Sequence, residues 1–280
     1  MIAGAAARLA EGALPLLPSG AERPIARLGG TIAYRTSVAA RDAVRENLAI
    51  VAPDRRDRER LVRQAFVEQV RNYLEIFRLA RLDHDQIRRA VVTAGWERFT
   101  AAVARGKGVV VASAHVGPIS VSGQIITANG YEITLPVERE TGEIARAVNR
   151  ARQRMGLRFV ETDSAFGIHR ILKRGGILGV LADRAVTGVG ERVPFFGRPA
   201  LLPSAHVALA LRTGAALIPA FAHRDGEIYR AIFEEELVLD RSGDRDADVR
   251  EGVRRWAAIL EPHIAAAPEQ WSVFEPVWRR

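Results

Sequence analysis

The sequence predicts an α/β protein in which helices flank a central mixed, largely parallel sheet, with a helical N-terminal layer. Short apolar runs of strand length recur along the second part of the chain, at 109–114, 131–137, 176–183 and 216–224. Stretches of helical character separate them, at 118–128, 142–155, 164–174 and 203–213. Alternating strands and helices are typical of parallel pairing, because each helix returns the chain to the same edge of the sheet.

The first 105 residues are predicted to be helical. Apolar side chains recur near helical spacing from Leu61 to Phe77, with arginine and glutamate opposite them. Another helix is expected over 37–53, where Ser37 begins it and Pro53 stops it.

The end of the chain is predicted to add one strand and one helix. Residues 227–239 alternate in polarity and are expected to pair at an edge of the sheet, and 246–268 have helical character. No internal repeat, low-complexity tract or linker interrupts the pattern. Residues 1–280 are therefore expected to form one domain, with the α/β core over 106–280.

Composition narrows the function. The chain has 280 residues, a net charge of +8 and no cysteine, which excludes a disulfide framework, a thiolate metal site and a cysteine nucleophile. A basic surface suits an anionic membrane or a phosphate-bearing substrate. Nucleic acid is not an expected partner, because no zinc-finger spacing or basic-aromatic motif is present. No metal is expected either, since the histidines lack close ligand spacing.

The N-terminal stretch 1–18 is apolar, but Arg8, Glu11 and Pro15 interrupt it. It is too short to span a bilayer and lacks the basic start of a signal peptide. Two interpretations stay open: a helix lying in the membrane interface, or a helix packed on the domain.

His115 is the first candidate catalytic residue, because it follows the apolar run 109–114 directly and a helix is predicted to begin soon after. Functional groups of α/β sheets gather where strands end and helices begin. Gly117 permits close backbone approach, and Pro118 suits a first helical turn. A neutral imidazole there can act as a general base toward a hydroxyl. The alternative is a histidine that caps the helix.

A series of segments, in order along the chain, resembles the bacterial lipid A late-acyltransferase family, part of the wider lysophospholipid acyltransferase group that includes phosphatidylinositol mannoside acyltransferases. The segments are ARDAVRENL (40–48), GKGVVVASAHVGPIS (106–120), NRARQRMG (149–156), GGILGVLADRAVTGVGERVPFFGRPALLP (175–203), LALRTGAALIPAF (209–221) and PEQW (268–271). The resemblance implies transfer of a fatty acyl group from a thioester donor, acyl-coenzyme A or acylated acyl carrier protein, to a hydroxyl of a glycolipid or lipid A-like acceptor.

His115 would be the general base of that reaction. The oxyanion would be stabilised by amides at the start of the following helix or by a nearby arginine. The resemblance also implies no cofactor beyond the acyl donor, and a place on the cytoplasmic face of the plasma (inner) membrane, as a peripheral or monotopic protein.

Ser120 departs from the family pattern, which has an aspartate or glutamate at that position. A serine cannot supply the charge that stabilises an imidazolium. Three outcomes stay open: the acid comes from elsewhere, with Glu138 and Asp183 as candidates because both follow predicted strands; a weaker base suffices; or catalysis is lost and lipid binding remains. Glu140 matches the family's acid after that strand as well as Glu138 does.

Other residues are candidates for substrate binding. Arg152 is the best match to the family's arginine and would meet a phosphate on the carrier or lipid. The pair Asp183–Arg184 either lines the site or forms an internal ion pair that shapes its turn. Phe195 and Phe196 either wall an acyl pocket or belong to the core.

The favoured function is therefore a membrane-associated acyltransferase. A catalytically silent lipid-binding protein is the main alternative, because of Ser120. A soluble thioester hydrolase that uses His115 on water is a third. A serine hydrolase is disfavoured, since no Gly-x-Ser-x-Gly elbow is present.

Overall fold

The computed structural model describes residues 20–137, 142–162, 164–185 and 188–278. The expected N-terminal helix over 1–18, and Glu138 with Glu140, lie outside these residues.

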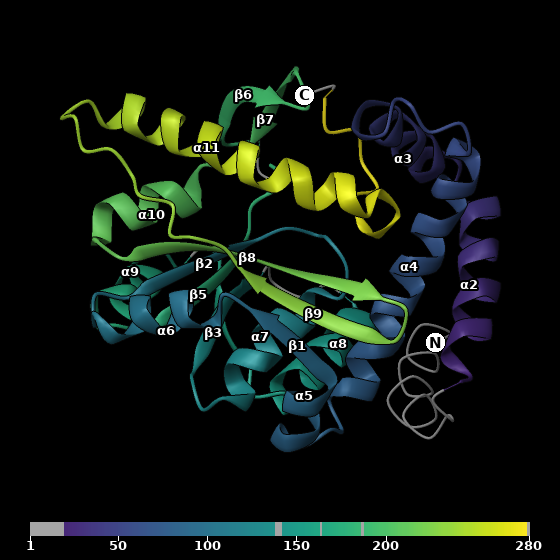
Figure 1. The fold of residues 1–280 in the computed structure, drawn as a ribbon, viewed down its shortest axis with the longest axis horizontal. Coiled ribbons are helices and arrows are strands. Elements are labelled where there is room, and N and C mark those ends of the chain that lie inside the picture. Colours follow the sequence, from purple (N-terminus) through teal and green to yellow (C-terminus); the bar gives the residue numbers. More distant parts are fainter. Residues whose placement is uncertain (1–19, 138–141, 163, 186–187, 279–280) are drawn as a thin grey trace.

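Within the described residues, a seven-stranded sheet has the order β1-β9-β8-β2-β5-β3-β4 (Figure 1). All neighbouring strands in it are parallel except β8 and β9. The strands are β1 Val91–Ala94, β2 Val109–Ser113, β3 Ile133–Val137, β4 Arg158–Glu161, β5 Ile177–Leu181, β8 Ala216–Asp225 and β9 Ile228–Phe233. This confirms the predicted α/β class with a mixed, largely parallel sheet.

Helices cover both faces of the sheet. α10 and α11 lie on one face and α5 and α7 on the other, while α2, α3 and α4 stand together beside one end of the sheet (Figure 1). The helices are α2 Glu22–Thr36, α3 Val38–Val51, α4 Arg58–Leu79, α5 His84–Ala90, α6 Trp96–Ala104, α7 Ile119–Ala128, α8 Glu143–Arg154, α9 Ala165–Lys173, α10 Ala205–Thr213, α11 Arg245–Ala266 and the short 3₁₀ helix η2 Pro268–Gln270.

β2 is buried on both faces, as its unbroken apolar run predicts. Val110 and Ala112 belong to one hydrophobic core, which also holds buried residues of α3, α10 and α11. Val109 and Val111 belong to a second core, shared with α5, α7 and α8. The alternation follows from the period of two along a strand. β2 therefore lies between the two hydrophobic cores, one on each face of the sheet.

Some expectations are wrong in detail. β9 is not an edge strand, because β1 pairs with it in parallel and takes the edge. β1 lies inside the first 105 residues, which were predicted to be helical. It has only four residues and stands between two helices, so its pattern was too short to recognise. The segment 191–202 forms an antiparallel hairpin of β6 Glu191–Phe195 and β7 Arg198–Leu202.

No helix in the described part of the chain is long and apolar enough to cross a membrane.

Candidate active site

The sheet topology brings His115 and Asp183 together. His115 follows β2 and Asp183 follows β5, and these two strands are parallel neighbours in the sheet. The carboxyl ends of parallel neighbours meet at one edge, where α/β proteins place their binding sites. Of the two acids that the sequence offered in place of Ser120, Asp183 is the one that the structure places on His115.

Asp183 binds the histidine at two points. The ring Nδ1 of His115 lies 2.7 Å from one carboxylate oxygen, and the main-chain N–H of His115 donates to the other at 2.9 Å. Asp183 is completely buried, while the His115 side chain keeps 21% of its surface exposed. The carboxylate therefore fixes the ring from inside, and the ring remains accessible from outside.

The surroundings keep Asp183 ionised. Burial alone would raise the pKa of its carboxyl, but the charge of His115, the hydrogen bonds from His115 and the indole N–H of Trp271 at 2.9 Å outweigh burial. The pKa of Asp183 therefore lies below its ordinary value. An ionised carboxylate on Nδ1 places the proton on that nitrogen and leaves Nε2 free to accept one.

The segment 270–272 closes the site from behind. The Gly117 N–H donates to the Gln270 carbonyl at 2.8 Å, and the Ser272 N–H donates to the His115 carbonyl at 2.7 Å. Val116 and Trp271 form an isolated bridge between these bonds. Both the backbone and the carboxylate partner of His115 are thus held by the stretch around Trp271.

Gly117 makes this closure possible. Its φ is +60°, and a Cβ built on it would lie 2.2 Å from the carbonyl oxygen of Ala222. Any other residue would push the loop after β2 away from β8. This is the close backbone approach that the sequence predicted.

A model of the family described as bacterial lipid A biosynthesis acyltransferase matches residues 9–280. The chain belongs to this family. The protein is an acyltransferase of lipid biosynthesis, as the series of segments had indicated.

Its relatives include the phosphatidylinositol mannoside acyltransferase of Mycobacterium tuberculosis (strain H37Rv), 28% identical over 227 residues, or 74% of this chain and 67% of the relative. The phosphatidylinositol mannoside acyltransferase of Mycolicibacterium smegmatis is 27% identical over 255 residues, or 85% of this chain and 79% of the relative.

The structure brings segments that are far apart in this chain into contact. Asn47, from the ARDAVRENL helix, donates to the carbonyls of Val273 and Glu275 at 3.3 and 2.9 Å and accepts from the Val277 N–H at 3.1 Å. It thereby anchors the chain just after Trp271. The terminal PEQW segment marked Trp271 as part of the family resemblance, but nothing in the sequence predicted that its indole binds Asp183.

Ser120 has a structural place. It lies in the first turn of α7 and only 8% of its surface is exposed. The carboxylate that contacts the ring of His115 is that of Asp183 and not one at position 120. The missing acid at position 120 therefore does not leave the histidine without an ionised partner.

Changing Ser120 to aspartate is expected to lower stability without raising turnover. The new carboxylate would be buried on α7, and an unpaired buried charge costs on the order of 3 kcal/mol. Ser122→Asp, at another buried position of the same helix, is the matched control. Urea unfolding and kcat are measured for both. Turnover above wild type in Ser120→Asp alone would show that position 120 acts on His115.

The expected oxyanion donors at the start of α7 are mostly engaged. The Gly117 N–H is bound to Gln270, the Ile119 N–H donates to the Gly117 carbonyl at 3.0 Å, and the Val121 N–H donates to the Pro118 carbonyl at 2.8 Å. These three amides are not free to bind an oxyanion in this conformation.

Phe195 and Phe196 belong to an aromatic cluster that includes Trp271, which binds Asp183 of the pair His115–Asp183, here called the dyad. Phe195 is fully buried, stacks on Trp278 with ring centres 5.5 Å apart, and meets the edge of Trp271 at 6.2 Å. The Phe196 N–H donates to Glu261 at 2.6 Å. Phe195 thus belongs to the hydrophobic core and supports the tryptophan that binds Asp183.

The two candidate arginines differ. Arg184 forms an ion pair with Glu275 at 3.5 Å, which ties the turn after β5 to the C-terminal segment. Arg152, on α8, is largely buried and has no ion-pair partner among the described residues. Burial lowers the pKa of its guanidinium, with the nearby Tyr73 opposing the shift. A guanidinium that is largely buried and lacks an ion-pair partner is suited to an incoming anion.

Among the residues that the structure describes, no group of three histidine or acidic side chains is arranged to hold a metal ion.

Proposed function

We propose that this acyltransferase moves a fatty acyl group from a thioester donor to a hydroxyl of a glycolipid, with His115 as general base. The observation that carries the proposal is the 2.7 Å contact between His115 Nδ1 and the buried Asp183 at the edge where β2 and β5 end. An imidazole held by a buried carboxylate, with part of its ring exposed, has the arrangement of a general base.

The reaction follows from this geometry. His115 Nε2 accepts the proton of the acceptor hydroxyl as its oxygen attacks the thioester carbonyl. Asp183 stabilises the imidazolium that forms. When the tetrahedral intermediate collapses, the C–S bond breaks and the leaving thiolate takes the proton from Nε2. The acceptor gains an ester, the donor leaves as a free thiol, and His115 returns to its neutral state.

The alternative of a silent lipid-binding protein rested on Ser120. Two observations support an active enzyme over this alternative: the chain belongs to a family of acyltransferases, and His115 contacts the buried carboxylate of Asp183, just after β5.

The acceptor class rests on the relatives and on charge. Both named relatives act on phosphatidylinositol mannosides, which carry sugar hydroxyls and a phosphate. Arg152, unpaired and largely buried, supplies a cation that would meet such a phosphate. The net charge of +8 fits a protein that works at the anionic cytoplasmic face of the plasma membrane as a peripheral enzyme. The donor is acyl-coenzyme A or acyl carrier protein, and no further cofactor takes part.

Mass spectrometry of the lipid products tests this function. The protein is incubated with each acyl donor and a phosphatidylinositol mannoside, with unmannosylated phosphatidylinositol as the matched acceptor and a lipid A precursor in parallel. A glycolipid heavier by one acyl chain is expected, with no such product from phosphatidylinositol. Free fatty acid as the sole product would identify a thioester hydrolase instead.

A further inference from the structure

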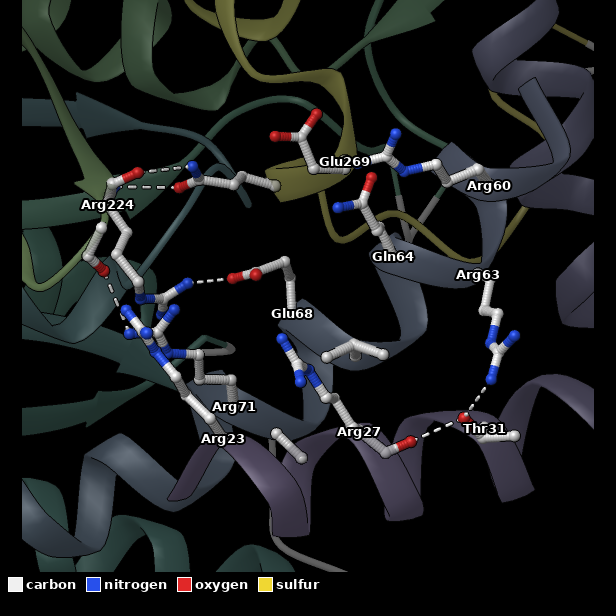
Figure 2. Close-up of a pocket in the computed structure, with 14 residues that line it drawn as sticks. Arg23, Arg27, Thr31, Arg60, Arg63, Gln64, Glu68, Arg71, Arg224 and Glu269 are labelled. Atoms are coloured by element: carbon white, nitrogen blue, oxygen red, sulfur yellow. Dashed lines mark hydrogen bonds and ion pairs between the residues drawn. The ribbon is translucent and has the colours of Figure 1, made fainter. Parts of the chain in front are cut away.

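A cavity of about 510 Å³ lies between α2 and α4, and η2 and the turn between β8 and β9 border it (Figure 2). Its lining is rich in arginine: Arg23, Arg27, Arg60, Arg63, Arg71 and Arg224. His115 and Asp183 are not part of it. The acyl-transfer mechanism above therefore leaves this cavity without a role.

Half of these arginines are neutralised. Arg224 is buried and pairs with Glu68 and Glu75, and Arg71 pairs with Glu75 at 3.1 Å. Arg23 pairs with Glu227. The pairs of Arg224 and Arg71 with Glu75 are buried, whereas that of Arg23 with Glu227 lies at the surface, and in each pair a carboxylate already balances the arginine.

The other three are not neutralised. Arg27 and Arg60 form no ion pair with any described residue, and Arg63 donates only to the hydroxyl of Thr31, at 3.2 Å. Glu269 also lines the cavity and carries a negative charge, and it has no ion-pair partner in the described part of the chain. The cavity thus keeps an excess of positive charge that the protein itself does not balance.

These groups line the cavity from two facing helices. Arg60, Arg63 and Gln64 follow one another on a single face of α4, and Arg27 faces them from α2. Figure 2 shows the side chains of Arg27 and Gln64 directed into the space between the two helices. The Thr31 hydroxyl, which accepts from Arg63, donates to the Arg27 carbonyl at 2.6 Å and joins the two walls.

Phosphate is the anion that fits this lining. Guanidinium groups bind phosphate oxygens through paired N–H donors, and Gln64 and Thr31 add neutral polar groups. The cavity volume is sufficient for a phosphate with part of its ester.

The outer face of α2 indicates where such a phosphate comes from. Leu28 and Ile32, one turn apart beside Arg27 and Thr31, have 66% and 53% of their surfaces exposed. Exposed apolar side chains next to arginines on one helix are typical of helices that lie in a membrane interface. A lipid headgroup and a soluble phosphate ester present the same chemistry to the cavity, and α2 favours the headgroup.

We propose that the cavity between α2 and α4 is a phosphate-binding site, separate from the dyad, in which Arg27, Arg60 and Arg63 hold the phosphate ester of a ligand. Phosphate binding at this site requires no turnover, so it can be tested independently of acyl transfer.

The test is binding by the full chain to two probes. Isothermal titration calorimetry uses sn-glycerol 3-phosphate, and sedimentation uses phosphatidylcholine vesicles with and without phosphatidylglycerol. The variant Arg27→Gln/Arg63→Gln is compared with Arg89→Gln/Arg212→Gln, which removes equal charge from exposed arginines outside the cavity. Each cavity arginine is expected to contribute about tenfold in affinity. Thermal unfolding of both variants checks the fold.

Each outcome decides the proposal. Loss of glycerol 3-phosphate binding in the cavity variant alone supports the site and assigns it a soluble ester. Loss of binding to phosphatidylglycerol vesicles, without wild-type affinity for glycerol 3-phosphate, supports the site and assigns it a lipid headgroup. The proposal is overturned if the cavity variant loses no more than the control, or if the wild type binds neither probe.

Discussion

Asp183→Asn is expected to lower kcat by about 10⁴-fold while the protein stays folded. The asparagine oxygen can still accept from the His115 N–H or the Trp271 indole, so the shape of the site is retained. Its amide N–H₂ would face Nδ1, which shifts the ring proton to Nε2 and leaves His115 unable to accept a proton from the acceptor. The charge that stabilises the imidazolium is also lost.

The measurement is steady-state kinetics with thermal unfolding as the check on folding. Because Asp183 is buried behind the ring, KM for donor and acceptor is expected to change little. Asp42→Asn, an aspartate on the exposed side of α3, is the control and should keep full turnover. A fall in kcat of less than about tenfold would contradict the assignment of Asp183 as the partner that orients and charges the base.

His115→Ala is expected to reduce turnover at least as far as Asp183→Asn does, because the group that accepts the proton is gone. The same change removes the side-chain hydrogen-bond partner of the buried Asp183 carboxylate, which costs about 3 kcal/mol of stability. His115→Gln is therefore made in parallel, since its side-chain amide can still donate to the carboxylate. His84→Ala, at an exposed histidine of α5, is the matched control.

Turnover by a folded His115→Gln protein at more than about a hundredth of the wild-type rate would rule out His115 as the general base, since such a base contributes at least that factor.

The spacing of apolar residues along the sequence predicted most of the fold and identified His115 as a catalytic candidate. The apolar run into His115 marks the end of a strand buried on both faces, and a glycine two residues later marks the backbone approach that Gly117 makes. Asp183 could be proposed as the acid because parallel strands end at one edge. Choosing it over Glu138 required knowing that β5, not β3, is the neighbour of β2.

Features that depend on distant contacts could not be predicted. The indole of Trp271 reaches Asp183 across 88 positions of the chain, and a single sequence gives no sign of that contact. β1 is four residues long and packs against a strand near the other end of the chain, so its local pattern resembled the helices beside it. The arginine-rich cavity draws on α2, α4 and β8, and the sequence showed only the net charge.

The most direct test is the release of free thiol from acyl-coenzyme A and from acylated acyl carrier protein, read with a thiol-reactive dye. The protein contains no cysteine, so it adds no background to the signal. Wild type and Asp183→Asn are compared with and without glycolipid vesicles. Acyl transfer by the His115–Asp183 pair predicts thiol release that requires the lipid in the wild type and falls below detection in Asp183→Asn. Equal release by both proteins, or none from either donor, would contradict it.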